Sequence, residues 1–141
     1  MATFAAVQDD LNSTKGPNEA SLLRFVFVSV DPARDQGKKL ADYQSAAAVP
    51  LIALGGTPEE VSKAATVFGV AYQPQPKRAD GSYQVRHSTD IYLVGPGGRI
   101  FKRFALNSDP KDIAAAVREF APRVPSKSKP KTVASAEGGA K

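Results

Sequence analysis

The chain has 141 residues, 42% of them hydrophobic and 23% charged, which is typical of a single globular domain with one buried core. It contains no cysteine, so disulfides, thiol nucleophiles and thiolate metal sites are excluded. The net charge of +5 resides mainly in residues 121–141, which hold five basic residues, one acidic residue and no apolar periodicity. We therefore predict a domain over residues 1–121 and a disordered basic tail over residues 122–141. We expect no nucleic-acid partner, and a weak phosphate- or membrane-binding arm is the alternative role for the tail.

The N-terminal part of the chain predicts a helix followed by a strand. Phe4, Val7 and Leu11 recur at the spacing of one face of an amphipathic helix, which residues 12–19 interrupt. Residues 25–30 are a near-continuous run of β-branched and aromatic residues. This run predicts a parallel strand that is covered on both faces.

The middle of the chain repeats this alternation of helix and strand. A second helix would place three side chains on one stripe, namely Leu40, Tyr43 and Ala47. Residues 50–54 read as a short buried strand. Thr57, Pro58 and Glu60 then form a capping-box signature for a third helix, which Gly69 closes. Its buried stripe is Val61, Ala65 and Phe68.

The last part of the domain predicts a loop, a hairpin and a helix. Residues 73–82 are polar and read as a loop. Residues 91–94 and 100–104 predict an antiparallel pair around the glycine-rich turn 95–98. A helix from about Ser108 would bury Ile113, Val117 and Phe120. Together these elements predict an α/β domain with a mixed sheet and flanking helices.

Three motifs in this order resemble the Sco/SenC family. They are residues 27–35 (Phe-Val-Ser-Val-Asp-Pro-Ala-Arg-Asp), residues 54–61 (Leu-Gly-Gly-Thr-Pro-Glu-Glu-Val) and residues 83–98, which contain the only histidine, His87. The resemblance covers roughly residues 2–120. It implies a thioredoxin-like fold and a copper chaperone that assembles the binuclear copper centre of cytochrome c oxidase. It also implies the copper-bearing subunit of that oxidase as partner, and an extracytoplasmic, membrane-tethered domain.

The resemblance assigns His87 as a copper ligand, whereas without it an ordinary surface histidine is expected. Family members hold copper through this histidine and two cysteines of a Cys-x-x-x-Cys motif. No residue of this chain matches those cysteines. Arg86 also stands where an acidic residue is common, and a cation there disfavours copper. Because Cu(I) needs soft sulfur ligands, we predict that the chain binds it no better than any protein with one exposed histidine.

The resemblance further implies that the chain lacks the central strand before the cysteine motif, at its N-terminus. The strands predicted at residues 25–30 and 91–94 would then lack a neighbour. They either pair with each other or leave a marginal, self-associating chain. The sequence itself shows no signal peptide and no apolar run of about 18 residues, so Met1 as the true start would imply a cytoplasmic protein.

Two functional hypotheses stay open at this point. The first is a copper-delivering assembly factor whose N-terminus is truncated, and an in-frame Cys-x-x-x-Cys upstream of Met1 would support it. The second is a cysteine-free thioredoxin-like binding or scaffold domain without metal or redox chemistry. Neither is an enzyme, and a peroxiredoxin-like peroxidase fails for want of a cysteine.

The remaining acidic residues have ordinary structural interpretations. Asp31 and Asp35 could serve as an acid–base pair, but we expect Asp31 to accept hydrogen bonds from turn amides and Asp35 to cap the next helix. Glu59 and Glu60 suit the first turn of a helix, where the dipole favours them, better than a metal site.

Overall fold

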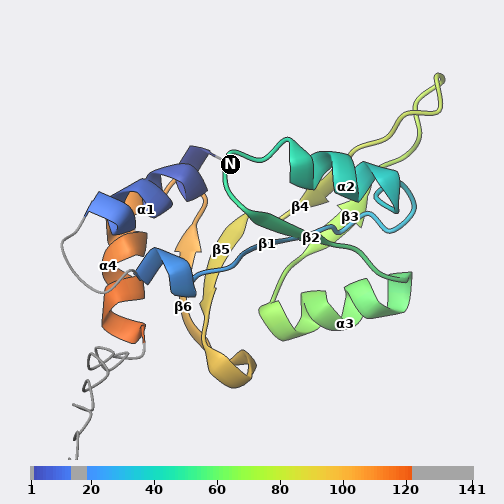
Figure 1. Cartoon of the computed structure of the whole chain (residues 1–141). Coiled ribbons are helices and arrows are strands. Elements are labelled where there is room, and N and C mark those ends of the chain that lie inside the picture. Colours follow the sequence, from blue (N-terminus) through green and yellow to red (C-terminus); the bar gives the residue numbers. More distant parts are fainter. Residues whose placement is uncertain (1, 14–18, 122–141) are drawn as a thin grey trace, which may run out of the picture.

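The structure is a computed structural model that describes residues 2–13 and 19–121. The chain alternates helices and short strands, and these elements form two groups, one at each end of the molecule (Figure 1). Helices α1 (Ala2–Ser13) and α4 (Pro110–Phe120) lie beside strands β5 (Asp90–Val94) and β6 (Ile100–Ala105). At the other end, helices α2 (Lys38–Ser45) and α3 (Pro58–Phe68) lie beside β1 (Phe25–Val28) and β2 (Leu51–Leu54). A hairpin of β3 (Tyr72–Pro74) and β4 (Val85–His87) completes that end, and 3₁₀ turns span Glu19–Leu22 and Pro96–Gly98.

The hydrophobic core sits between α1, α4 and the β5–β6 pair. Val7 and Leu11 of α1 are each only 1% exposed and pack with apolar residues of α4 and with Phe104 of β6. Burial of side chains of this size contributes about 1.5–3 kcal/mol each. Ala114 and Ala116 are almost fully buried and let the two helices approach closely. The predicted amphipathic faces of both helices are therefore confirmed, although Phe120 is only partly buried and stacks on Phe101 at 4.8 Å.

The strands within residues 19–121 form three separate pairs. The β1–β2 pair is parallel, with Val26 opposite Ile52, and the β3–β4 and β5–β6 pairs are antiparallel. The predicted hairpin around residues 95–98 is confirmed, and its turn is the 3₁₀ segment Pro96–Gly98. Sequence reasoning missed the β3–β4 hairpin, because it read residues 73–82 as an unpaired polar loop.

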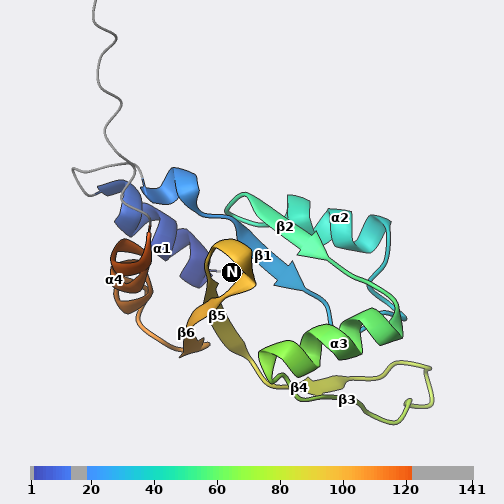
Figure 2. The ribbon, with the colours of Figure 1, turned by 90° about the horizontal axis from the view of Figure 1, so that it is seen from below.

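The strands β1 and β5 are not hydrogen-bonded to each other, so direct pairing of these two strands is ruled out in this structure. In Figure 2 the arrow of β1 runs beside that of β2, whereas β5 belongs to the other pair, with β6. The prediction that β1 is covered on both faces is wrong. Phe27 faces α2 and packs on Tyr43 at 4.4 Å, whereas the opposite face is open. That face, which we call the open apolar face, has side chains that are 41–46% exposed: Val26, Val28, Ile52 and Leu54.

The local signals around α3 are confirmed in detail. The hydroxyl of Thr57 accepts from the amide of Glu60, the Glu60 carboxylate accepts from the amide of Thr57, and Gly69 ends the helix at φ 65°. The predicted second helix is shorter than expected, because it ends at Ser45 and leaves Ala47 outside. No helix among residues 2–13 and 19–121 is long and apolar enough to cross a membrane. The predicted basic tail and residues 14–18 of the predicted break lie outside the described residues.

Candidate functional site around His87

His87 ends strand β4, directly opposite Tyr72 of β3. Its imidazole is exposed, and Nδ1 lies 2.9 Å from the carbonyl oxygen of Val85. Since a carbonyl only accepts, this contact requires Nδ1 to carry the proton. The lone pair of Nε2 is then directed away from the backbone, and Nε2 is the atom that could bind a metal.

The surroundings of His87 supply no matching set of metal ligands. Among the described residues, no group of three or more His, Cys, Asp or Glu side chains could hold a metal ion. Arg86, a permanent cation, precedes the histidine in the strand. One imidazole next to a guanidinium does not fit Cu(I), which selects polarizable sulfur. Glu59 and Glu60 belong to the start of α3, where Glu60 completes the capping box.

A polar latch joins the loop after β1 to the segment that carries His87. We define the latch as Asp31, Arg34 and Tyr83. The Asp31 carboxylate accepts from Nε and the backbone amide of Arg34 and, at 2.9 Å, from the hydroxyl of Tyr83. Arg34 Nη1 donates to the Tyr83 carbonyl at 2.8 Å, and the guanidinium carbon lies 4.0 Å from the centre of the Tyr83 ring. The latch thus fixes the segment just before β4, at the loop end of the β3–β4 hairpin, against the loop after β1.

The latch also sets the protonation of its members. Burial by itself would raise the pKa of Asp31, but the hydrogen bonds from Arg34 and Tyr83 and the charge of Arg34 outweigh burial and lower it. The hydrogen bond to Asp31 raises the pKa of Tyr83, and that of Arg34 is raised for the same reason. At neutral pH Asp31 and Arg34 are therefore charged, and Tyr83 keeps the proton that it donates to Asp31.

The carboxylates of Asp31 and Asp35 have different partners, Arg34 and Tyr83 for Asp31 and Ser29 for Asp35, and each makes a structural contact. Asp31 does accept from a turn amide, as predicted. The prediction that Asp35 caps the next helix is wrong, because Gly37 occupies that position and makes no side-chain cap. The carboxylate of Asp35 instead accepts from the hydroxyl of Ser29 at 2.6 Å. The sequence offered a signal for the Asp31–Arg34 contact in their i, i+3 spacing, but none for Tyr83.

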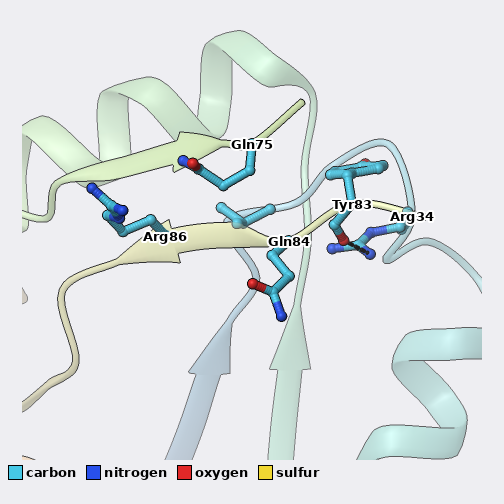
Figure 3. A pocket seen from close by; sticks show the side chains of 6 residues that line it. Arg34, Gln75, Tyr83, Gln84 and Arg86 are labelled. Carbon is cyan, nitrogen blue, oxygen red and sulfur yellow. Dashed lines mark hydrogen bonds between the residues drawn. The ribbon is translucent and has the colours of Figure 1, made fainter. Parts of the chain in front are cut away.

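An open pocket of about 570 Å³ lies beside the latch (Figure 3). Arg34 and Tyr83 stand at one end of it and Arg86 at the other, with side-chain amides between them. Its lining residues are Arg34, Gln75, Tyr83, Gln84, Val85 and Arg86. The lining offers hydrogen-bond donors and cations but no nucleophile and no carboxylate, so the pocket is suited to binding rather than to catalysis.

Comparison with known proteins finds the same family throughout. The family model described as SCO1/SenC matches residues 1–122. The mitochondrial SCO1 homolog of Homo sapiens is 38% identical over 92 residues, which are 65% of this chain and 31% of that protein. The SCO2-like protein of Rickettsia bellii is 28% identical over 95 residues, 67% of this chain and 48% of that protein. This chain spans about a third of the length of the human relative.

Solved structures share the fold. Arabidopsis thaliana ScoI with copper bound matches with a TM-score of 0.70 and 30% identity, covering 83% of this chain and 70% of that one. Yeast Sco1 with copper bound matches with a TM-score of 0.71 and 28% identity, covering 91% of this chain and 72% of that one. These likenesses confirm the predicted α/β, thioredoxin-like fold class.

Proposed function

The chain belongs to the SCO1/SenC family, and from this membership we propose that it serves copper delivery during cytochrome c oxidase assembly as a binding domain that does not by itself carry Cu(I). The family supports the pathway, since solved relatives are described with copper bound. The ligand set of this chain supports the restriction. Copper is the cargo of such a protein, and His87 is the one imidazole that the chain can offer to it.

The observation that carries the restriction is the isolation of His87. The chain contains no cysteine and a single methionine, at position 1. Among the described residues, no second histidine or cluster of carboxylates approaches the imidazole. A coordination sphere with one nitrogen cannot reproduce the affinity of a site with two thiolates, and outer contacts do not replace missing ligands. Thiol–disulfide exchange also requires a thiolate, so we propose no catalytic residue.

The proposed partner is the copper-bearing subunit of the oxidase, and the proposed location is extracytoplasmic and membrane-associated. Both follow from the family, which includes mitochondrial and bacterial Sco proteins. The second candidate function, a scaffold domain without copper chemistry, is favoured by the latch and the donor-rich pocket, which need no metal.

Titration with Cu(I) against a competing chelator tests the proposal on the wild-type chain and on His87→Ala. We expect both proteins to leave the chelator complex intact at equimolar concentration. Stoichiometric Cu(I) transfer to the wild type that His87→Ala abolishes would overturn the restriction. A third sample with Tyr72→Phe, which alters the residue opposite His87 without removing the imidazole, serves as the matched control.

Binding to the isolated copper-bearing domain of the oxidase separates the two candidate functions. The copper-delivery proposal expects an affinity for the metal-free partner domain that rises when Cu(I) is supplied, because His87 can then complete a ligand set shared with the partner. If the chain is a scaffold domain, its affinity for the partner domain should be the same with and without Cu(I). Calorimetry with and without Cu(I), repeated with His87→Ala, distinguishes these outcomes.

A further inference from the structure

The β3–β4 hairpin carries cations that the fold does not neutralise. Three basic side chains, Lys77, Arg78 and Arg86, lie between Tyr72 and His87, and the ion pairs formed by the described residues do not include them. The single acidic residue of this segment, Asp80, accepts a hydrogen bond from the amide of Ser82 at 2.9 Å within its own loop. By contrast, Arg34 is paired with Asp31. The hairpin therefore presents positive charge to solvent.

The hairpin also supplies directional donors beside this charge. The pocket in Figure 3 places the amides of Gln75 and Gln84 between Arg86 and the latch. The backbone N–H of Gln75 donates to the backbone carbonyl of Gln84 at 2.7 Å, and this hydrogen bond holds the two strands together where the pocket begins. The latch holds Tyr83, the residue before Gln84, in place. The backbone that carries the glutamine donors is therefore fixed at this point.

We propose that this surface, formed by Gln75, Lys77, Arg78, Gln84 and Arg86 and called here the basic hairpin surface, docks an extended acidic segment of a partner protein. Guanidinium and ammonium groups pair with carboxylates, and the glutamine amides donate to the same oxygens. Alternate residues of an extended segment point to one side about 7 Å apart, a spacing that suits cations distributed along a hairpin. The inference rests on the proposed function only in that it identifies the feature by which a partner is brought next to His87.

The chemistry of the surface favours a polypeptide over a nucleic acid. Single-stranded nucleic acids need exposed aromatic faces for stacking, and the ring of Tyr83 is already covered by Arg34. Binding to duplexes relies on many phosphate contacts, whereas residues 1–120 have nearly balanced charge, with 14 basic and 13 acidic residues. Acidic side chains on a partner pair with the few cations present, and their carboxylate oxygens also accept hydrogen bonds from the glutamine amides.

The test uses the full chain and a fluorescein-labelled peptide in which Glu alternates with Ser, with a Gln-for-Glu version as the neutral probe. Fluorescence anisotropy at low ionic strength should show binding of the acidic peptide that weakens as salt is added. Lys77→Glu combined with Arg86→Glu should weaken binding about tenfold or more, because like charges then face the peptide. The matched control, Lys63→Glu with Lys111→Glu, makes the same change in net charge on exposed residues of α3 and α4 and should alter binding less than about threefold.

Three results would overturn the proposal. They are equal binding of the neutral peptide, equal loss in the control variant, and tighter binding of single-stranded DNA or inorganic pyrophosphate than of the acidic peptide. Far-UV circular dichroism and melting verify that each variant is folded. The milder Arg86→Gln, which removes charge without reversing it, should still weaken binding severalfold. No copper is present in this experiment, so its failure leaves the outcome of the Cu(I) titration unaffected.

Discussion

The hydroxyl of Tyr83 donates a 2.9 Å hydrogen bond to Oδ1 of Asp31 across 52 residues of chain. Asp31 is only 7% exposed, and its charge is balanced by Arg34. The contact ties the β3–β4 hairpin, which has no sheet neighbour among the described strands, to the loop that follows β1. The latch is therefore one of the contacts that hold the segment carrying His87 in place.

Replacing Asp31 with Asn should destabilise the chain by about 1–3 kcal/mol at neutral pH, because Arg34 and Tyr83 lose a charged acceptor. The folded-state pKa of Asp31 is lowered from its ordinary value of 3.8. Its stabilising contribution is thus present above that value and is lost as pH falls through the lower folded-state pKa. Urea unfolding as a function of pH should show the difference between wild type and Asp31→Asn shrinking toward zero in acid.

Asp42→Asn is the matched control for this measurement. Asp42 pairs with Lys38 at 2.7 Å on the exposed surface of α2, where such a pair contributes about 0.3–0.5 kcal/mol. A difference for Asp31→Asn that is no larger than that of Asp42→Asn, or that does not depend on pH, would contradict the structural role of the latch.

The elements that could be predicted from the sequence are those whose stability is decided locally. The capping box of Thr57 and Glu60 and the left-handed Gly69 act over four residues or fewer, and both are present. The amphipathic helices are confirmed for the same reason, since spacing alone defines the faces of Val7 and Leu11. The exposed face of β1 could not be predicted, because the apolar run specifies that a strand forms but not which neighbours cover it.

The candidate site was predictable only in part. The motif around His87 marks the histidine, but the contacts that position it come from residues far away in sequence. Asp80-Gly81 is a turn signal, and Gly81 has the positive φ that such a turn requires. The strand before it could not be predicted, because β3 contains Pro74 and is only three residues long. Its stability comes from pairing with β4 and from the latch, and both are tertiary effects.

Replacing Thr57 with Ala should destabilise the chain by about 1 kcal/mol through loss of the cap on α3, and Thr57→Ser should be nearly neutral. Thermal unfolding of both variants tests this prediction.

Replacing Gly69 with Ala should destabilise the chain by about 1–2 kcal/mol, because the residue has φ 65°, which alanine adopts with strain. A steric clash does not contribute, since the added Cβ meets no atom within 4 Å. The penalty there is therefore one of backbone conformation. Thermal unfolding of Gly69→Ala and Gly69→Asn tests this, and a smaller loss in Gly69→Asn than in Gly69→Ala would separate conformational strain from a packing effect.

Gly95→Ala should destabilise the chain by about 1–3 kcal/mol for a steric reason. An added Cβ would overlap the Phe101 ring, which is stacked on Phe120 at 4.8 Å. The backbone of Gly95 has φ −96°, which alanine adopts without strain. Combining the change with Phe101→Leu should recover part of the loss, so urea denaturation should give a favourable coupling energy. Strictly additive losses would show that the ring does not cause the penalty.

The open apolar face should make the chain self-associate. Val26 and Val28 of β1 lie opposite Ile52 and Leu54 of β2, and all four are 41–46% exposed beside a strand edge that has no partner among the described residues. Charged residues on such a surface oppose edge-to-edge association. We therefore expect Val26→Lys with Val28→Lys to lower the apparent mass of the chain in light scattering at high concentration and to slow aggregation on heating.

Leu106→Lys is the control, because it places a charge on a residue that is 55% exposed and lies outside this pair of strands. If Leu106→Lys reduces association as much as the double variant, then general repulsion rather than the open apolar face governs it. A wild-type chain that stays monomeric across the concentration range would show that the open apolar face does not drive self-association.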